Sequence, residues 1–143
     1  MAQVQIDDLH SVRKILGKSQ REMAELLGIS IRAVQSYEQG WRSMTPATQR
    51  LALLFLFLRW RQTQKKVKPC WKIRGCAPKD RAQCPVYVNR GGEFCWLISG
   101  NRYDHEILGS WKAKLAACQA CPVMQRWIPT ETEALGALAA AGA

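Results

Sequence analysis

Six cysteines are the side chains of this chain with the clearest capacity for chemistry. Thiolates bind iron and zinc, and thiols exchange with disulfides, so a group of them indicates a metal centre or a redox function. A region of about 60 residues is too small for a large hydrophobic core, and such regions commonly depend on metals or disulfides for stability. We therefore expect the cysteines to decide both the shape and the chemistry of their region. They are Cys70, Cys76, Cys84, Cys95, Cys118 and Cys121.

Three kinds of cysteine chemistry are open. An iron–sulfur cluster needs four thiolates, and neighbouring Trp residues would shield it from water. A structural zinc site also takes four ligands but commonly uses two C-x-x-C pairs, and here Cys118 and Cys121 form one such pair. A thiol–disulfide pair needs no metal. We favour iron–sulfur, with zinc as the alternative and disulfides third. His105, between two acidic residues, is a weaker candidate ligand.

The residues that follow the cysteines form a pattern of their own. Two cysteines precede Trp (Cys70-Trp71 and Cys95-Trp96), and two precede Pro (Cys84-Pro85 and Cys121-Pro122). With the spacing C-x5-C-x7-C-x10-C-x22-C-x2-C, this segment resembles the two-CW domain, a small bacterial and archaeal module often attached to regulatory proteins. It departs from that family after Cys121, where family members tend to have an acidic residue and a terminal Phe. The resemblance implies a small regulatory module and specifies no ligand.

Local patterns also predict secondary structure around the cysteines. Residues 93–98 follow a Gly-Gly pair and read as a short strand. Residues 107–117 read as a helix that leads into the C-x-x-C motif.

Ahead of the cysteines, three short helices are predicted between residues 7 and 40. Each begins after a side chain that can cap a helix, and each ends at a glycine suited to a left-handed turn. Ser19 is followed three residues later by Glu22, which predicts a capping box. Two short helices joined by a tight glycine-containing turn are typical of a helix-turn-helix. The caps and closing glycine are Asp7 and Asp8 with Gly17 for the first helix, Ser19 with Gly28 for the second, and Ser30 with Gly40 for the third.

The segment S-Q-R-E-M-A-E-L-L-G-I-S-I-R-A-V-Q-S-Y-E-Q-G, residues 19–40, resembles the phage-repressor or Xre family of helix-turn-helix proteins. The resemblance covers residues 9–58 and implies a domain of five helices that binds double-stranded DNA. It also implies that Gln20 holds a phosphate and that the exposed side of the third helix enters the major groove. Carried over by position, the base-reading candidates are Ile31, Arg32, Gln35 and Ser36, with Ala33 available to a thymine methyl group.

The chemistry of these side chains agrees with that assignment. Arg pairs with guanine and Gln with adenine in the major groove, each contributing about 1–3 kcal/mol of discrimination. Arg42 and Ser43, just past the third helix, are candidates for phosphate contacts that set the register.

A further helix is predicted from Thr45 and Pro46 onward. Residues 51–58 of this helix are apolar on every side, which indicates burial all round. One face would close the small domain. The other would either pair with a second copy of the chain, giving a homodimer that reads two half-sites, or pack against the cysteine region.

Charge and length bound the remaining possibilities. The net charge is +10, and residues 59–81 hold nine basic residues against one acid, which favours an anionic partner. No enzyme motif is present. The N-terminus has no apolar signal segment, and the longest apolar run is far shorter than the ~20 residues of a membrane span, so we expect a cytoplasmic protein that does not contact a membrane.

The sequence therefore predicts a mainly α-helical protein in four parts: a five-helix helix-turn-helix domain over residues 1–58, a basic connector over 59–68, an irregular cysteine-rich metal-binding domain over 69–128, and a disordered tail over 129–143. The predicted function is a sequence-specific transcriptional regulator, not an enzyme, whose cysteine-ligated metal centre senses redox state or iron. The alternative is a DNA-binding protein whose cysteine domain is a structural zinc module for protein–protein interaction.

Overall fold

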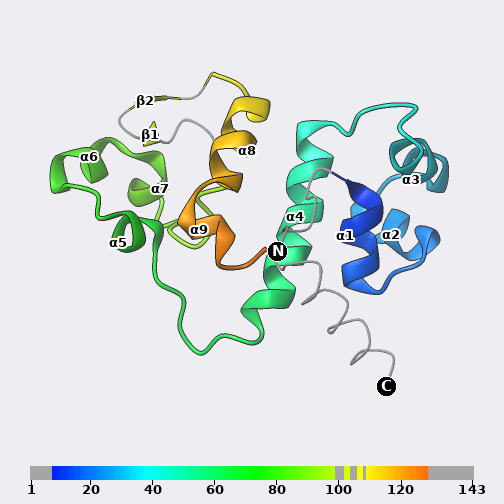
Figure 1. Ribbon diagram of the computed structural model, residues 1–143, viewed down its shortest axis with the longest axis horizontal. Helices are drawn as coiled ribbons and strands as arrows, with labels where there is room; N and C mark the ends of the chain where they lie inside the picture. Colours follow the sequence, from blue (N-terminus) through cyan, green and yellow to red (C-terminus); the bar gives the residue numbers. More distant parts are fainter. Residues whose placement is uncertain (1–7, 99–101, 104–105, 108, 129–143) are drawn as a thin grey trace. The chain divides into compact units, whose positions relative to one another are not determined.

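The computed structural model of the chain describes residues 8–98, 102–103, 106–107 and 109–128, and these residues are mainly helical (Figure 1). The chain divides into two compact units, one that includes the residues up to Thr63 and one that comprises Gln64–Trp127. We call them the N-terminal unit and the cysteine unit. The predicted fold class, mainly helical with a helix-turn-helix and a small irregular cysteine-rich region, is confirmed. Among the described residues, no helix combines the length and apolar character that a membrane crossing requires.

The N-terminal unit contains α1 (Leu9–Leu16), α2 (Gln20–Leu27), α3 (Ile31–Glu38) and α4 (Pro46–Arg61). The predicted caps are confirmed: side chains of Asp8, Ser19, Ser30 and Thr45 each accept a hydrogen bond from a backbone N–H in the first turn. These bonds satisfy donors that a helix N-terminus leaves without a partner, and a cap of this kind contributes about 1 kcal/mol.

Within the described part of this unit there are four helices, whereas the family resemblance implied five. The difference lies in α4, which runs without a break for 16 residues. After Pro46 at its first position, no Gly or Pro interrupts it, so nothing ends the helix before residue 61. Its last turn therefore includes Arg59 and Arg61, which the sequence had placed in the basic connector.

The core of the N-terminal unit forms where α1 and α2 pack against α4, and where α2 and α1 pack against α3 (Figure 1). Burial of each large apolar side chain stabilises the folded state by about 1.5–3 kcal/mol. This packing fixes the orientation of α3, the helix that carries most of the predicted DNA contacts. The buried side chains are Leu9, Val12, Ile15, Met23, Ala24, Leu27, Ala33, Val34, Ala52, Leu53, Leu56 and Phe57.

The cysteine unit is built from short helices. They are α5 (Cys70–Arg74), α6 (Pro78–Gln83), α7 (Pro85–Val88), α8 (Trp111–Gln119) and α9 (Pro122–Gln125). Three of them, α6, α7 and α9, begin with Pro, a residue that fits the first helical position because it lacks an N–H. Strands β1 (Arg102–Tyr103) and β2 (Glu106–Ile107) form an antiparallel pair, with Arg102 opposite Ile107.

Two secondary-structure predictions in this unit are corrected. Residues 93–98 form turns rather than a strand, because the N–H of Phe94 donates to Gly91 (2.8 Å) and that of Leu97 donates to Phe94 (2.9 Å). These local bonds use backbone groups that a strand would present to a neighbour. The predicted helix over 107–117 begins only at Trp111, where Ser110 Oγ caps it by accepting from the N–H of Ala113 (3.1 Å).

Aromatic and sulfur-containing side chains fill the core of the cysteine unit. Trp96 is fully buried, and its ring lies 5.2 Å from that of Trp127, centroid to centroid. Trp71 meets Tyr87 edge to face at 4.8 Å. Such aromatic pairs contribute about 0.5–1.5 kcal/mol beyond the area they bury. Both tryptophans of the C-W pairs therefore hold the unit together. The predicted tail over 129–143 and His105 lie outside the described residues.

Candidate nucleic-acid interface and cysteine cluster

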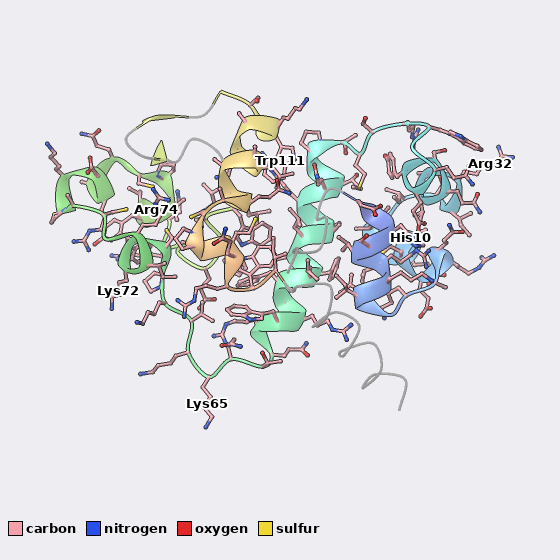
Figure 2. The ribbon with its side chains drawn as sticks, in the orientation of Figure 1. His10, Arg32, Lys65, Lys72, Arg74 and Trp111 are labelled. Carbon is pink, nitrogen blue, oxygen red and sulfur yellow. The ribbon has the colours of Figure 1, made fainter. Side chains whose placement is uncertain are left out.

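One side of α3 carries the predicted base-reading residues. Ile31 and Arg32 are exposed, and Gln35 and Ser36, each four residues further on, are half-buried. Residues four apart on a helix lie on the same face, so the four side chains form one continuous strip. Arg32 projects from α3 away from the rest of the N-terminal unit (Figure 2). The polar side chains of the strip are of the kinds that pair with base edges in the major groove.

Ala33 is not part of this strip. Its side chain is buried, with 5% of the residue exposed, and it adjoins the fully buried Val34. Residue 33 therefore belongs to the core of the N-terminal unit, because a helix turns by about a quarter of a circle per residue and carries it away from Ile31 and Arg32. We leave Ala33 out of the reading surface, which corrects its assignment to a thymine methyl group.

Gln20, the predicted phosphate contact, stands at the start of α2. Its amide Nε2 donates to Glu38 Oε2 at 3.0 Å. A Gln amide has two N–H donors, so one hydrogen can orient the side chain on Glu38 while the other points to a phosphate. The contact with Glu38 thus positions the amide without using up its capacity to bind an anion.

Glu38 is the centre of a polar network that joins α1, α2 and α3. Arg13 donates to Glu38 Oε1 from Nε (2.9 Å) and from Nη2 (2.7 Å), and His10 Nδ1 lies 2.9 Å from the same oxygen. Arg13 Nη1 also donates to the carbonyl of Lys18 at 2.9 Å. The Glu38 side chain is 5% exposed. Burial alone would raise the pKa of this carboxyl, but the hydrogen bonds from Arg13, His10 and Gln20 outweigh it and lower the pKa.

No sequence pattern predicts this network. Arg13 and Glu38 lie 25 positions apart, and no local pattern connects residues on different helices. A basic residue in the last turn of one helix and an acidic residue at the end of another are each common on helix surfaces. Neither residue therefore indicated that the two would form an ion pair.

The residues after α3 form an exposed corner. Gly40 adopts a left-handed φ of 77°, and the N–H of Trp41 donates to the carbonyl of Ser36 at 2.9 Å, which closes the helix. Trp41 is 76% exposed, and the guanidinium of Arg42 stacks over the ring of Tyr37 at 5.0 Å. Arg42 and Ser43, the predicted phosphate contacts, are both exposed. Trp41 is a candidate contact that the sequence analysis missed, although a Trp directly after a helix-ending Gly was visible there.

Residues 9–59 match the family model described as Helix-turn-helix, so the N-terminal unit is a helix-turn-helix domain. This match supports a DNA-binding regulator. It ends at residue 59 and does not reach the cysteines. No curated protein and no solved structure gives a significant match.

In the cysteine unit, all six cysteines are free thiols. Cys70 and Cys95 share a side-chain hydrogen bond. That bond lowers the pKa of Cys70, whereas burial raises it. The backbone N–H groups of Trp71 and Cys70 and the charge of Arg74 lower the pKa further. The same bond, together with burial, raises the pKa of Cys95 well above its usual 9.0.

Two basic side chains lie among the cysteines. Arg74 Nη1 donates to Cys121 Sγ at 3.4 Å. Lys114 is 3% exposed and lies close enough to Cys118 to favour its thiolate electrostatically. Burial nonetheless raises the pKa of Cys118, and the neighbouring Cys121 adds to that rise. Basic groups next to thiols favour the negatively charged form of sulfur, whether as a free thiolate or as a metal ligand.

The placement of these side chains does not form a metal site. In the part of the chain that the structure describes, no three His, Cys, Asp or Glu side chains are grouped so that they could hold a metal ion. An iron–sulfur cluster and a four-cysteine zinc site both need four ligands around one centre. The described arrangement therefore gives no support to either group, and both stay predictions. His105, the additional candidate ligand, is outside the described residues.

Proposed function

We propose that this protein is a sequence-specific transcriptional regulator that reads double-stranded DNA with α3 in the major groove. The observation that carries the proposal is the continuous strip of Ile31, Arg32, Gln35 and Ser36 on the exposed side of α3. An α-helix fits the width of the major groove, and each base pair presents a distinct pattern of donors and acceptors there.

Each side chain of the strip has a defined part in this proposal. Arg32 donates to guanine O6 and N7, and Gln35 exchanges hydrogen bonds with adenine N6 and N7. Ile31 supplies an apolar contact to a thymine methyl, in place of the buried Ala33. Ser36 bonds to either kind of base edge.

Three residues outside the strip would position the domain on the DNA backbone. Gln20, Arg42 and Ser43 contact phosphates, which sets the register without reading sequence. Gln20 is oriented for this by Glu38, and Arg42 and Ser43 lie on the exposed corner after α3. The net charge of +10 adds attraction to the phosphates that does not depend on sequence.

We further propose that two copies bind as a homodimer. Helix-turn-helix domains that read half-sites commonly act in pairs on two-fold symmetric DNA. In α4, Leu58 is an exposed apolar residue and a candidate for that contact. Sedimentation at micromolar protein concentration tests the proposal, and a monomer on DNA of every length would contradict it.

The main test is a comparison of two DNA duplexes. A preferred duplex is selected from a random pool, and the dissociation constant is measured for it and for a shuffled duplex. Arg32→Ala should weaken binding to the preferred duplex by about 5–150-fold, which corresponds to about 1–3 kcal/mol. Binding to the shuffled duplex should change far less.

The matched control is Lys14→Ala, which removes the same charge from an exposed position on α1. If Arg32→Ala and Lys14→Ala have equal effects on both duplexes, α3 does not read bases and the proposal fails.

For the cysteine unit we propose that its oxidation state regulates DNA affinity. The support is the six free thiols and the Cys70–Cys95 contact. No step of this proposal depends on iron–sulfur or zinc. Dissociation constants for the preferred duplex are compared between reduced and oxidised protein, and equal values would contradict regulation by redox state.

A further inference from the structure

Cys70 and Cys95 are 25 positions apart in the chain, yet their thiols are close enough to influence one another's ionisation. Two short segments bring them together. Cys70 is the first residue of α5, and its backbone N–H donates to the carbonyl of Gly92 at 3.0 Å. Cys95 lies in the turns that follow Gly92. The backbone hydrogen bond therefore ties the start of α5 to the segment that carries the second thiol.

Gly92 makes this approach possible because it has no side chain. A Cβ at residue 92 would lie 2.7 Å from Cζ3 of Trp71 and would also collide with Cβ of Pro69. These atoms belong to the two residues that flank Cys70, and both are held by the packing of the unit. The neighbouring Gly91 is different, since a Cβ there would lie 2.5 Å from Cδ1 of Ile98, the far end of a flexible side chain.

The two thiols differ in their access to solvent. Cys70 is half-buried, whereas Cys95 is buried. A reagent from solvent can therefore reach Cys70 first. The buried thiol of Cys95 is then available to react with the modified Cys70. This order suits a two-step exchange in which one thiol is attacked from outside and the second resolves the product.

We propose that Cys70 and Cys95 form an intramolecular disulfide when the protein meets a low-molecular-weight disulfide. The Cys70 thiolate attacks one sulfur of the reagent, a mixed disulfide forms, and one thiolate leaves. Cys95 then loses its proton to that thiolate and attacks the Cys70 sulfur, which expels the second thiolate. Two protein thiols are oxidised, and one reagent disulfide is reduced to two thiols. The inference deepens the proposed redox regulation and names the pair that would carry it.

Peptide mapping of the chain gives a direct assay of this pairing. Reduced protein is treated with oxidised glutathione, the remaining thiols are alkylated, and the protein is digested with trypsin without reductant. Cleavage after Lys and Arg places Cys70 in the peptide 67–72 and Cys95 in 91–102. Cys76 falls in 75–79, Cys84 in 82–90, and both Cys118 and Cys121 in 115–126.

The expected product joins peptide 67–72 to peptide 91–102 and is lighter than their reduced sum by two hydrogen atoms. Cys70→Ser and Cys95→Ser should each abolish this product, and Cys76→Ser and Cys84→Ser should retain it. If Cys95→Ser does not fold, Cys70→Ser alone still decides. A disulfide confined to peptide 115–126, a mixture of pairings, or complete alkylation of all six thiols would each overturn the inference.

Two glycine variants test whether the contact has the stated geometric cause. Gly92→Ala should reduce the yield of the joined product, because its Cβ forces the segment away from Pro69 and Trp71. Gly91→Ala should leave the yield unchanged, because Ile98 can rotate. Equal yields in the two variants would contradict the role of Gly92. Each of these experiments measures the mass of a peptide product. Its outcome therefore does not depend on whether the protein binds DNA, and it can fail while the proposed function holds.

Discussion

Arg13 of α1 and Glu38 of α3 form a buried ion pair, in which Nη2 of Arg13 lies 2.7 Å from Oε1 of Glu38. Only 9% of the Arg13 side chain and 5% of the Glu38 side chain are exposed. Nη1 of Arg13 also donates to the carbonyl of Lys18. Both charges are therefore compensated on all sides, and the pair fixes the helix that carries the proposed DNA-reading strip.

Removing the charge of Glu38 should destabilise the N-terminal unit. Glu38→Gln leaves the Arg13 guanidinium buried without its counter-charge, and breaking such a pair costs about 3 kcal/mol of unfolding free energy. Urea denaturation followed by circular dichroism measures the change. Glu25→Gln, at an exposed position on α2, is the control and should change stability by less than about 0.5 kcal/mol. Equal effects of the two substitutions would show that the pair does not stabilise the fold.

Protonation of the Glu38 carboxyl should lower the free energy of unfolding in acid. The pKa of Glu38 is lower in the folded state than its ordinary value of 4.5, so folding favours the ionised form. Its contribution is fully present above the unfolded pKa and is lost as pH falls through the folded pKa. Unfolding free energy measured from pH 7 downward should therefore begin to drop near pH 4.5. Glu38→Gln should remove part of this drop, and an unchanged pH profile would contradict the assignment.

Arg42 should differ from Arg32 in what it contributes to DNA binding. A phosphate contact weakens binding to all sequences when it is removed, and it lowers the slope of log affinity against log salt concentration by about 1. We expect this for Arg42→Ala with both the preferred and the shuffled duplex. Titrations at four salt concentrations measure the slope. A loss restricted to the preferred duplex would instead assign Arg42 to base recognition.

Trp41 should contribute to DNA binding and not to stability. Because it is 76% exposed, its replacement removes little buried surface, but its place beside Arg42 puts a large aromatic ring next to the proposed groove-binding helix. Trp41→Ala should weaken DNA binding and leave the thermal midpoint unchanged. Val88→Ala, at an exposed apolar position in the cysteine unit, is the control for a general effect of surface apolar groups. A lowered midpoint for Trp41→Ala would place the ring in the fold instead.

Metal analysis tests the predicted cofactors. The favoured prediction, an iron–sulfur cluster, is tested in protein purified without oxygen. Iron, sulfide and zinc contents are measured together with the visible spectrum. Matching iron and sulfide would confirm the predicted iron–sulfur cluster, and one zinc per chain would confirm the alternative. Either result would mean that the cysteines rearrange around the metal.

Much of the N-terminal unit was predictable because its signals are local. Asp8, Ser19 and Ser30 begin their helices, and Gly17 and Gly28 end theirs, since capping bonds and left-handed turns are set within a few residues. The exposed strip on α3 followed from the helical period and from the family resemblance. Ala33 was misassigned because a position near the edge of a helix face can be buried or exposed, and only the packing of neighbouring helices decides which.

The sequence by itself determined where α1 and α2 begin and end, where α3 and α4 begin, and the identity of the six thiols. Tertiary structure alone decided which side chains meet: Arg13 with Glu38, Gln20 with Glu38, and Cys70 with Cys95. These contacts join residues 18–25 positions apart, whose distance depends on the packing of several elements at once. Short segments with little periodicity, such as residues 93–98, take their conformation from that packing, because their own backbone preferences are weak.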